Sequence, residues 1–360
     1  MKPTMQSITE KVHNGIRLEA AEGIYLYESG DLLSIGELAR EKKLQKSGRN
    51  VYFNVNCHIN LTNICVSRCK FCAFGVDKDG EGGPYLMTPK QAFEYGEQSV
   101  GHGITEFHIV SAMHPDMPFD YYLEIVKNFN QAFPDIHIQA FTAVEIFYFS
   151  QISGLSIREV LSALKEAGLG SMPGGGAEIL NDRLRKQLCP KKAMSDEWLE
   201  VHRTAHELGI KTNCTMLFGH IETYKDRIEH MIRLRDLQDT VPGFQSFIPL
   251  PFLPENTKMT NVKRTSAVDD LKTMAISRLM LDNIDHIKAF WIMLGLPIAQ
   301  IALDFGADDI DGTVIEERIM HAAGAETQKG ITKDEIIALI KESGYIPIER
   351  DTVYNVLATF

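Results

Sequence analysis

Residues 65–72 read CVSRCKFC, and three cysteines at spacings of four and three give this stretch its chemistry. The thiolates of Cys65, Cys69 and Cys72 could hold three irons of a cubane cluster and leave the fourth iron open. A metal centre that binds a substrate keeps one such vacant position. A zinc site is the alternative, but zinc motifs usually combine two Cys-x2-Cys pairs or add a spaced His pair. The stretch therefore predicts an iron–sulfur cluster with an open iron.

Composition and charge restrict the class of protein. Of the 360 residues, 44% are hydrophobic and 24% are charged, which is ordinary for a globular protein with a large core. No apolar run reaches the eighteen or so residues of a membrane span, and the N-terminus lacks the apolar segment of a signal peptide. The net charge of −11 argues against nucleic acid or an anionic membrane as the main partner. We therefore expect a cytoplasmic protein that binds neither.

Predicted strands alternate with predicted helices along the chain. The first strand, at 51–61, runs directly into the cysteine loop. Further strands are expected at 106–110, 136–141, 171–172, 212–218, 244–248, 287–293 and 301–305. Helices are expected at 88–101, 119–133, 156–167, 195–208, 225–238, 268–283 and 314–323. This α/β alternation implies parallel pairing and predicts a (β/α)8 TIM-type barrel, with a partial six-strand barrel as the alternative.

The regions outside the alternating pattern are expected to cover the barrel. Residues 1–50 predict an N-terminal helical cap, with helices at 9–21 and 34–42, the second capped by Ser34. Residues 51–325 are expected to form the barrel, with a bend at 80–83. Residues 326–360 are expected to form a C-terminal helical extension that packs against it.

Polar and small side chains follow the second and third predicted strands. Ser111 is small, which would let backbone carbonyls approach a ligand amine. His114 is either a ligand contact or a loop histidine. Gln139, Thr142 and Glu145 suit a ribose or a substrate hydroxyl, although Glu145 could equally cap the following turn. Because loops after parallel strands meet at one face of a barrel, we expect these residues near the cysteines.

A glycine run and a second glycine loop follow the next two strands. Residues 173–178 read PGGGAE, and Gly174 and Gly175 permit main-chain groups to approach a ligand closely, while Glu178 can accept hydrogen bonds from ribose hydroxyls. The run lacks the Lys-Ser/Thr ending of a phosphate loop, so ATP is not expected. Gly219 opens a GHIE stretch after the following strand.

The last third of the chain supplies candidate partners for a substrate anion. Asn256 lies in a rigid, partly apolar loop that suits an aromatic ring, and Lys288 precedes an aromatic stretch. Arg278 can bind a carboxylate through two hydrogen bonds, or can form an ordinary ion pair on a helix. The three carboxylates within 308–311 either bind a divalent cation or cap helices and fix the loop.

The cysteine pattern with its aromatic residue resembles the radical S-adenosylmethionine superfamily. The resemblance implies a [4Fe-4S] cluster held by Cys65, Cys69 and Cys72, with the methionine part of S-adenosylmethionine bound at the fourth iron. It places Phe71 and the Gly219 stretch beside the adenine. Ser111 stands where the superfamily usually carries a Gly-Gly-Glu motif, so this stretch departs from the pattern.

Longer stretches narrow the resemblance. HINLTNIC at 58–65, PGGGAEIL at 173–180 and the block 277–313 are similar to the menaquinone-pathway radical enzymes that act by way of futalosine, and to deazaflavin synthase subunits. Within that group, 141–146, 219–223 and 305–313 are most similar to the aminodeoxyfutalosine synthases, whereas the cyclases usually differ at the first of these.

That family implies an activity and its partners. Its enzymes add the 5′-deoxyadenosyl radical to 3-[(1-carboxyvinyl)oxy]benzoate, release methionine and CO2 or bicarbonate, and take one electron from an external reductant such as flavodoxin or ferredoxin. For the substrate carboxylates we expect partners among His58, Asn256, Arg278 and Lys288. The alternatives are a dehypoxanthine futalosine cyclase, a deazaflavin synthase-like enzyme, an iron–sulfur electron carrier and a zinc-bound interaction protein.

Overall fold

The computed structural model describes residues 2–80, 83–315, 317–328 and 330–360. The strands are β1 Asn50–Asn54, β2 Asn56–Asn60, β3 Glu106–Val110, β4 His137–Ala140, β5 Ser171–Met172, β6 Lys211–Phe218, β7 Phe244–Pro251, β8 His286–Ile287, β9 Asp309–Gly312, β10 Ile346–Arg350 and β11 Val356–Thr359. The longer helices are α1 Met5–His13, α2 Ala20–Glu28, α3 Leu32–Ser47, α4 Pro89–Val100, α5 Phe119–Ala132, α6 Ala143–Ser153, α7 Ile157–Ala167, α9 Ser195–Glu207, α10 Tyr224–Thr240, α11 Ala267–Met280 and α15 Lys333–Glu342. The shorter ones are α8 Asp182–Leu188, α12 Trp291–Leu294, α13 Leu296–Ala302, the 3-10 turn η1 Leu303–Phe305 and α14 Ile319–Ala322.

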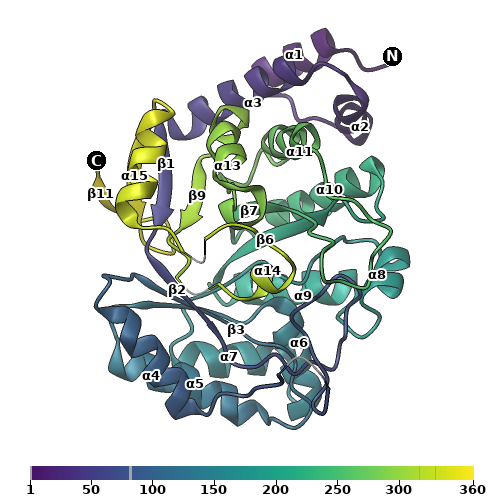
Figure 1. Cartoon of the computed structure of the whole chain (residues 1–360). Helices are drawn as coiled ribbons and strands as arrows, with labels where there is room; N and C mark the ends of the chain where they lie inside the picture. Colours follow the sequence, from purple (N-terminus) through teal and green to yellow (C-terminus); the bar gives the residue numbers. More distant parts are fainter. Residues whose placement is uncertain (1, 81–82, 316, 329) are drawn as a thin grey trace.

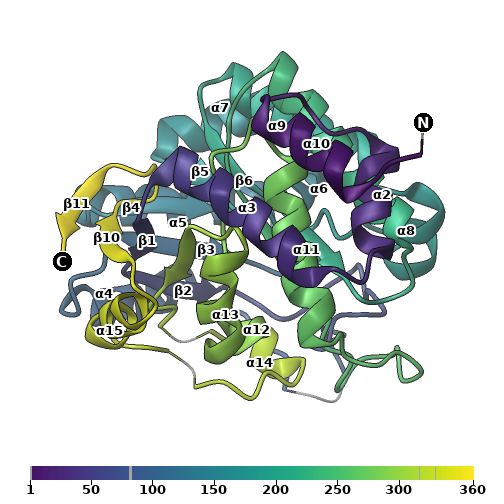
Figure 2. The same cartoon turned by 90° about the horizontal axis from the view of Figure 1, so that it is seen from above.

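Parallel strands surround the core. Within the described residues, β2 to β8 form a seven-stranded parallel sheet in chain order, and β11-β10-β1-β9 form a second sheet. β1 runs into β2, β9 pairs with β1, and a parallel bridge between Lys288 and Asp309 joins β8 to β9. Backbone pairing thus passes through eight strand positions, as the predicted (β/α)8 barrel requires. Helices lie outside the strands, and α3 crosses above β1 and β9 (Figures 1 and 2).

Local sequence explains where several helices begin. Thr88 caps α4 through a capping box with Gln91, and Pro89 occupies its first turn, as the sequence predicted. Ser156 caps α7 in the same way with Glu159. Asp31, and not Ser34, caps α3, because the helix begins two residues earlier than expected. A capping residue in the local sequence therefore sets where each of these helices begins.

Of the two strands predicted near the end of the barrel, one is confirmed only at its first residue and the other is wrong. The strand at 287–293 belongs to β8 only at Ile287, since Trp291–Leu294 is helical, and 301–305 lies in α13 and η1. Short apolar runs cannot be assigned to strand or helix by periodicity alone, and here Gly295, at a φ of 77°, and Pro297 start a helical turn. The final strand position belongs instead to β9, whose acidic sequence did not indicate a strand.

The ends of the chain differ in how well they were predicted. The N-terminal region is helical, as expected, with three helices in place of two. The C-terminal extension is helical over α15 but continues into β10 and β11, so the prediction of a wholly helical extension is wrong there. β10 pairs with one edge of β1, so the backbone N–H and C=O groups of β10 find hydrogen-bond partners in β1. In a helix these groups would be paired within the same segment. The proposed division into 1–50, 51–325 and 326–360 stays a prediction.

Two further predictions concern the connections. The helix expected at 314–323 is confirmed only for Ile319–Ala322. Of the bend expected at 80–83, residues 81 and 82 lie outside the described part of the chain. Through the described ranges, none of the helices has the length and apolar character that crossing a bilayer requires.

Candidate active site

A cavity of about 330 Å³ opens at the carboxyl ends of the barrel strands. The cysteine loop after β2 forms one wall, and the loops after β3 to β8 and helix α14 form the rest. Thirteen of the predicted site residues line it, namely His58, Cys65, Cys69, Phe71, Cys72, Ser111, Gln139, Thr142, Glu145, Gly174, Gly175, Glu178 and Lys288. The folding of parallel strands thus brings together residues that are far apart in the sequence.

Backbone hydrogen bonds fix the cysteine loop. The Cys65 amide donates to the Val76 carbonyl at 3.0 Å, and the Arg68 guanidinium donates to the Gly75 carbonyl at 2.8 Å. Gly75 passes so close that a Cβ there would lie 3.2 Å from Cys65 Cβ and 3.7 Å from Cys72 Sγ. The loop is therefore wrapped tightly around its three cysteines.

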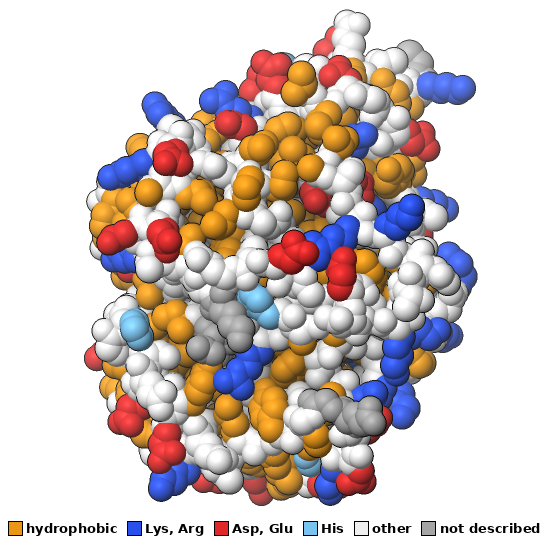
Figure 3. Space-filling model, in the orientation of Figure 1, with side chains coloured by type: hydrophobic (Ala, Val, Ile, Leu, Met, Phe, Trp, Pro, Cys, Tyr) orange, Lys and Arg blue, Asp and Glu red, His pale blue; other side chains and the backbone are white. Residues whose placement is uncertain are grey.

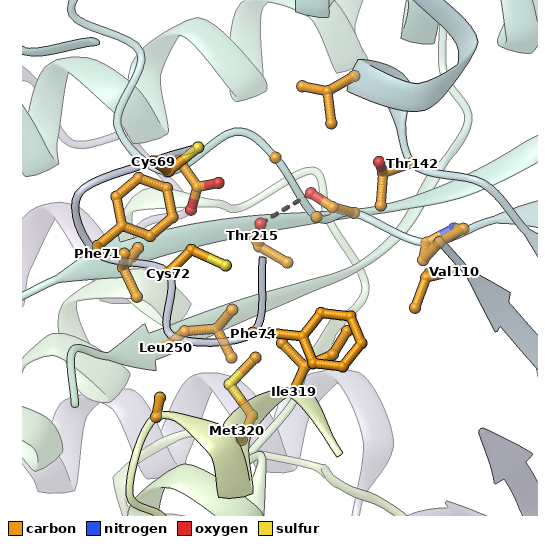
Figure 4. A pocket seen from close by; sticks show the side chains of 18 of the residues that line it. Cys69, Phe71, Cys72, Phe74, Val110, Thr142, Thr215, Leu250, Ile319 and Met320 are labelled. Atoms are coloured by element: carbon orange, nitrogen blue, oxygen red, sulfur yellow. Dashed lines mark hydrogen bonds between the residues drawn. The ribbon is translucent and has the colours of Figure 1, made fainter. Parts of the chain in front are cut away.

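The three cysteines of the loop lie at the cavity wall. Within the described ranges, no group of three His, Cys, Asp or Glu side chains is arranged to hold a metal ion. Cys65, Cys69 and Cys72 instead border the same cavity, and Figure 4 shows Cys69 and Cys72 on either side of Phe71. Burial raises the pKa of the Cys72 thiol, while the Gly75 amide, which donates to its sulfur at 3.3 Å, opposes that shift. Such donors stabilise a metal-bound thiolate.

Two residues beside the cluster loop were missed by sequence reasoning. The Cys189 thiol lies beside Cys69, and the Lys192 ammonium donates to Glu178 at 2.8 Å. Lys192 Nζ also lies 5.2 Å from the centroid of the Phe71 ring. The sequence spacing between these two residues and the three cysteines does not indicate that they meet. They reach the cysteine loop only because of the turn after α8.

The glycine run packs against the neighbouring strand. A Cβ on Gly174 would lie 2.6 Å from the Cys214 Cα, and one on Gly175 would lie 3.0 Å from Thr142 Cγ2. The Thr215 hydroxyl donates to the Gly174 carbonyl at 2.8 Å, a bond drawn in Figure 4. Glycine is therefore required at Gly174 by the approach of β6, and the backbone of the run is presented to the cavity.

Glu145 both caps a helix and faces the cavity. Its carboxylate accepts hydrogen bonds from the Ser111 amide and the Thr142 amide, each at 2.7 Å, and from the Thr142 hydroxyl at 2.6 Å. Burial raises the pKa of Glu145 to about 7, although these hydrogen bonds favour the ionised form. Gln139 is held by a bond from its amide to the Ser171 hydroxyl at 3.1 Å.

The floor of the cavity carries imidazoles and a buried ion pair. His58 stacks on His108 with ring centroids 4.3 Å apart, and the His58 Nε2 atom is buried with no hydrogen-bond partner among the described residues. His108 Nδ1 lies 3.5 Å from the Glu106 carboxylate. Lys288 Nζ lies 2.9 Å from Asp311 Oδ1. A buried polar atom without a partner marks a place where a ligand group would be favoured.

One side of the cavity is apolar. Figure 4 shows Phe74, Leu250, Ile319 and Met320 gathered together, away from Thr142. These side chains come from the cysteine loop, β7 and α14. The surface they form can bury an aromatic ring.

Three predicted site residues lie outside the cavity. The Gly219 amide donates to Glu222 at 2.6 Å, and a Cβ there would lie 2.2 Å from Thr265 Cγ2. Asn256 is exposed and donates to the Ala322 carbonyl at 3.2 Å. Arg278 is fully buried beneath the barrel, where its guanidinium lies 2.7 Å from the Asp308 carboxylate. None of the three lines this cavity, and their roles in binding stay predictions.

The acidic loop at 308–311 is used for ion pairs. Asp308 accepts from Arg278, Asp309 accepts from Arg350 at 2.7 Å, and Asp311 accepts from Lys288. His114 also has a loop role, because its Nδ1 accepts from the Asp116 amide at 3.1 Å. Both observations favour the structural alternatives that the sequence left open.

Comparison with known proteins agrees with this geometry. The radical SAM superfamily matches residues 59–234, and the CofH/MqnC C-terminal region matches residues 241–359. The aminodeoxyfutalosine synthase of Thermus thermophilus is 45% identical over 98% of this chain and 96% of its own length. That of Streptomyces coelicolor is 41% identical over 99% and 94%.

Other relatives and solved structures extend the comparison. The 5-amino-6-(D-ribitylamino)uracil–L-tyrosine 4-hydroxyphenyl transferase of Methanopyrus kandleri is 39% identical over 96% of this chain and 93% of its own length. The crystal structure of methylornithine synthase covers 94% of this chain and 97% of its own, with a TM-score of 0.76 at 18% identity, which shows the fold alone. Proteins of the superfamily use a [4Fe-4S] cluster and S-adenosylmethionine. The chain belongs to the radical SAM superfamily, in the group that carries the CofH/MqnC C-terminal region.

Proposed function

We propose that this chain is an aminodeoxyfutalosine synthase of menaquinone biosynthesis. It would join the 5′-deoxyadenosyl part of S-adenosylmethionine to 3-[(1-carboxyvinyl)oxy]benzoate and release methionine and CO2 or bicarbonate. The observation that carries the proposal is the 45% and 41% identity, over nearly the whole chain, to two synthases of that name. When bound, the cluster supplies the electron that cleaves S-adenosylmethionine.

The cysteine wall would hold the cluster and S-adenosylmethionine. Cys65, Cys69 and Cys72 are the three ligands, and Lys192 offers a buried cation beside them for the methionine carboxylate. Phe71 and the backbone at Gly174 and Gly175 offer surfaces for the adenosyl part. Ser111, Gln139, Thr142, Glu145 and Glu178 would position its ribose.

The floor and the apolar side would hold the benzoate. Its ring fits the surface of Phe74, Leu250, Ile319 and Met320, away from water. Its carboxylates need donors, and Lys288 and His58 are the candidates that reach the cavity. Tight burial of this ring protects a reactive carbon centre from side reactions with solvent. The exposed Asn256 and the buried Arg278 have no part in this arrangement.

A second candidate is transfer of a 4-hydroxyphenyl group, which the relative from Methanopyrus kandleri is named for. That reaction would also bury an aromatic ring in the cavity. The futalosine cyclase is a third candidate from the resemblance. The identity values, 45% and 41% against 39%, favour the synthase.

Substrate supply under anaerobic conditions decides between the first two candidates. The reconstituted enzyme should receive S-adenosylmethionine and reductant with either the enolpyruvyl benzoate or tyrosine plus the ribitylaminouracil. Mass spectrometry of an adenosylated product from the benzoate supports the synthase. Free 5′-deoxyadenosine with a tyrosine-derived adduct supports the phenyl transfer. An external one-electron reductant such as flavodoxin or ferredoxin, and a cytoplasmic location, belong to this proposal.

A further inference from the structure

Basic side chains gather on the outer side of the cysteine loop. Residues 61–76, 182–192 and 256–264 together contain ten Lys or Arg residues and a single acid, Asp182, in a chain whose net charge is −11. Figure 3 shows Lys and Arg side chains along the flank over α8. A local cationic surface on an acidic protein needs an explanation beyond average composition.

Backbone contacts bring these three segments together. The Lys70 amide donates to the Leu188 carbonyl at 2.9 Å, and the Lys258 amide donates to the Lys70 carbonyl at 3.0 Å. The turn after α8 closes with the Lys192 amide donating to the Cys189 carbonyl at 3.0 Å. Lys70, Lys186, Lys191 and Lys258 are all exposed, and we call these four lysines the basic surface.

The four ammonium groups are not neutralised by neighbouring carboxylates. Among the described residues, none of the four takes part in an ion pair. The nearby acids have other partners, since Asp77 pairs with Arg68, Glu255 pairs with Arg264, and Asp182 accepts from the amide and hydroxyl of Ser195. Within the same turn, Lys192 points inward to Glu178 while Lys191 remains exposed. The basic surface is thus free to meet a negatively charged partner.

The basic surface lies directly behind a cluster ligand. Lys70 is peptide-bonded to Cys69, and its amide donates to the carbonyl of Leu188, which stands three residues before Lys191. The cavity side of the loop is occupied by the substrate site, so the outer side is the remaining short route to the cluster. A partner that delivers electrons would gain from docking here.

We propose that the basic surface docks an acidic one-electron carrier protein, which reduces the cluster from the outer side of the cysteine loop. The inference rests on the proposed function for its need of an electron. One electron passes from the carrier's reduced flavin to the oxidised cluster, so the carrier is oxidised and the cluster reduced by one electron. Complementary charges on such surfaces raise the association rate and orient a short-lived complex.

Binding of a flavodoxin to the cluster-loaded enzyme tests this surface. The variant Lys186→Glu/Lys191→Glu should be compared with Lys127→Glu/Lys341→Glu, which changes the net charge equally on α5 and α15. At low salt the first variant should bind oxidised flavodoxin about tenfold more weakly than wild type, and the control within about twofold. Raised salt should weaken wild-type binding and reduce the difference between the variants.

Turnover separates this inference from the proposed function. With dithionite as reductant the first variant should keep the wild-type rate, whereas its KM for reduced flavodoxin should rise about tenfold. Equal loss of binding in both variants, or no loss in either, overturns the docking surface. The docking surface is also overturned if Lys186→Glu/Lys191→Glu binds flavodoxin as wild type does but loses the binding of wild type to vesicles containing phosphatidylglycerol. If wild type makes no product with dithionite, the proposed function fails while the binding constants still test the surface.

Discussion

Lys288 and Asp311 form a buried ion pair at the floor of the cavity, with Lys288 Nζ 2.9 Å from Asp311 Oδ1. Lys288 follows β8 and Asp311 lies in β9, and a parallel bridge between Lys288 and Asp309 joins these two strands. A cation held in this way is positioned before a substrate arrives, which lowers the cost of ordering it on binding. The ion pair therefore fixes the donor that we propose for a substrate carboxylate.

Replacing Lys288 should weaken binding of the benzoate substrate. Lys288→Gln removes a charge-assisted hydrogen bond worth about 2 kcal/mol, so KM for the benzoate should rise ~30-fold. The dissociation constant for S-adenosylmethionine should stay within about twofold. Lys263→Gln, an exposed change outside the cavity, is the matched control. Equal weakening of both ligands would contradict this role, because it would indicate a general disturbance of the site.

The cluster ligands can be separated from the thiol beside them. Cys69→Ala should abolish the [4Fe-4S] signal after anaerobic reconstitution, because the three cysteines of the loop are the proposed ligands. Cys189→Ala should retain iron and the cluster absorbance, although its thiol lies beside Cys69. Iron content and electron paramagnetic resonance measure both. Retention of a full cluster in Cys69→Ala would remove the basis of the proposal.

We predict that His58 lowers the stability of the free protein and strengthens binding of the benzoate substrate. Its Nε2 atom is buried without a partner, which costs about 1–3 kcal/mol in the free protein. His58→Phe keeps an aromatic ring on His108 and removes that atom. The free energy of unfolding should therefore stay unchanged or rise, while kcat/KM for the benzoate falls at least tenfold. Urea unfolding and steady-state kinetics measure the two quantities, and a fall in both would indicate a structural role.

The cysteine loop and the glycine run could be predicted because their chemistry is local. Spacing of the thiols and the need for glycine at Gly174 are written into short stretches, and both line the cavity. Cys189 and Lys192 could not be predicted, since a turn that depends on the packing of α8 brings them to the site. Arg278 shows the opposite error, because a helix sequence does not say which end of the barrel its long side chain faces.

The closing strand shows the same limit for the fold. Residues 301–305 have the apolar pattern of a strand but lie in a short helix, whereas the acidic β9 forms the strand. Asp309 can be buried in this strand because Arg350 and Tyr354 donate hydrogen bonds to its carboxylate. Arg350 lies 41 residues later in the chain. Long-range ion pairing of this kind has no signature in a local window of sequence.

A buried histidine should make stability depend on pH. His230 Nδ1 accepts from the Leu180 amide at 3.0 Å and its Nε2 faces the Thr215 carbonyl at 3.0 Å. Burial lowers the pKa of His230 to about 3 from 6.5. Between those values the unfolded chain binds more protons, so the contribution of neutral His230 is complete above pH 6.5 and is lost as the pH falls.

The measurement is urea unfolding of the apoprotein from pH 7 to pH 4. His230 should contribute a loss of up to about 1.4 kcal/mol in the free energy of unfolding for each unit of acidification below pH 6. His230→Gln should lower stability at pH 7 but flatten that slope. An unchanged slope in the variant would show that other groups carry the acid sensitivity.

The C-terminal strand β10 should stabilise the barrel through Arg350, its last residue. Arg350 is fully buried and pairs with Asp309 at 2.7 Å. Arg350→Ala leaves a buried carboxylate without its cation and should lower the free energy of unfolding by about 3–5 kcal/mol. Arg233→Ala breaks a pair with Asp196, whose side chain is 90% exposed, and should cost less than about 1 kcal/mol. Chemical denaturation of the three proteins compares them. A similar small loss in both variants would mean that the C-terminal strand lies on the barrel without supporting β9, and that the floor of the cavity is held by β1 and β8 alone.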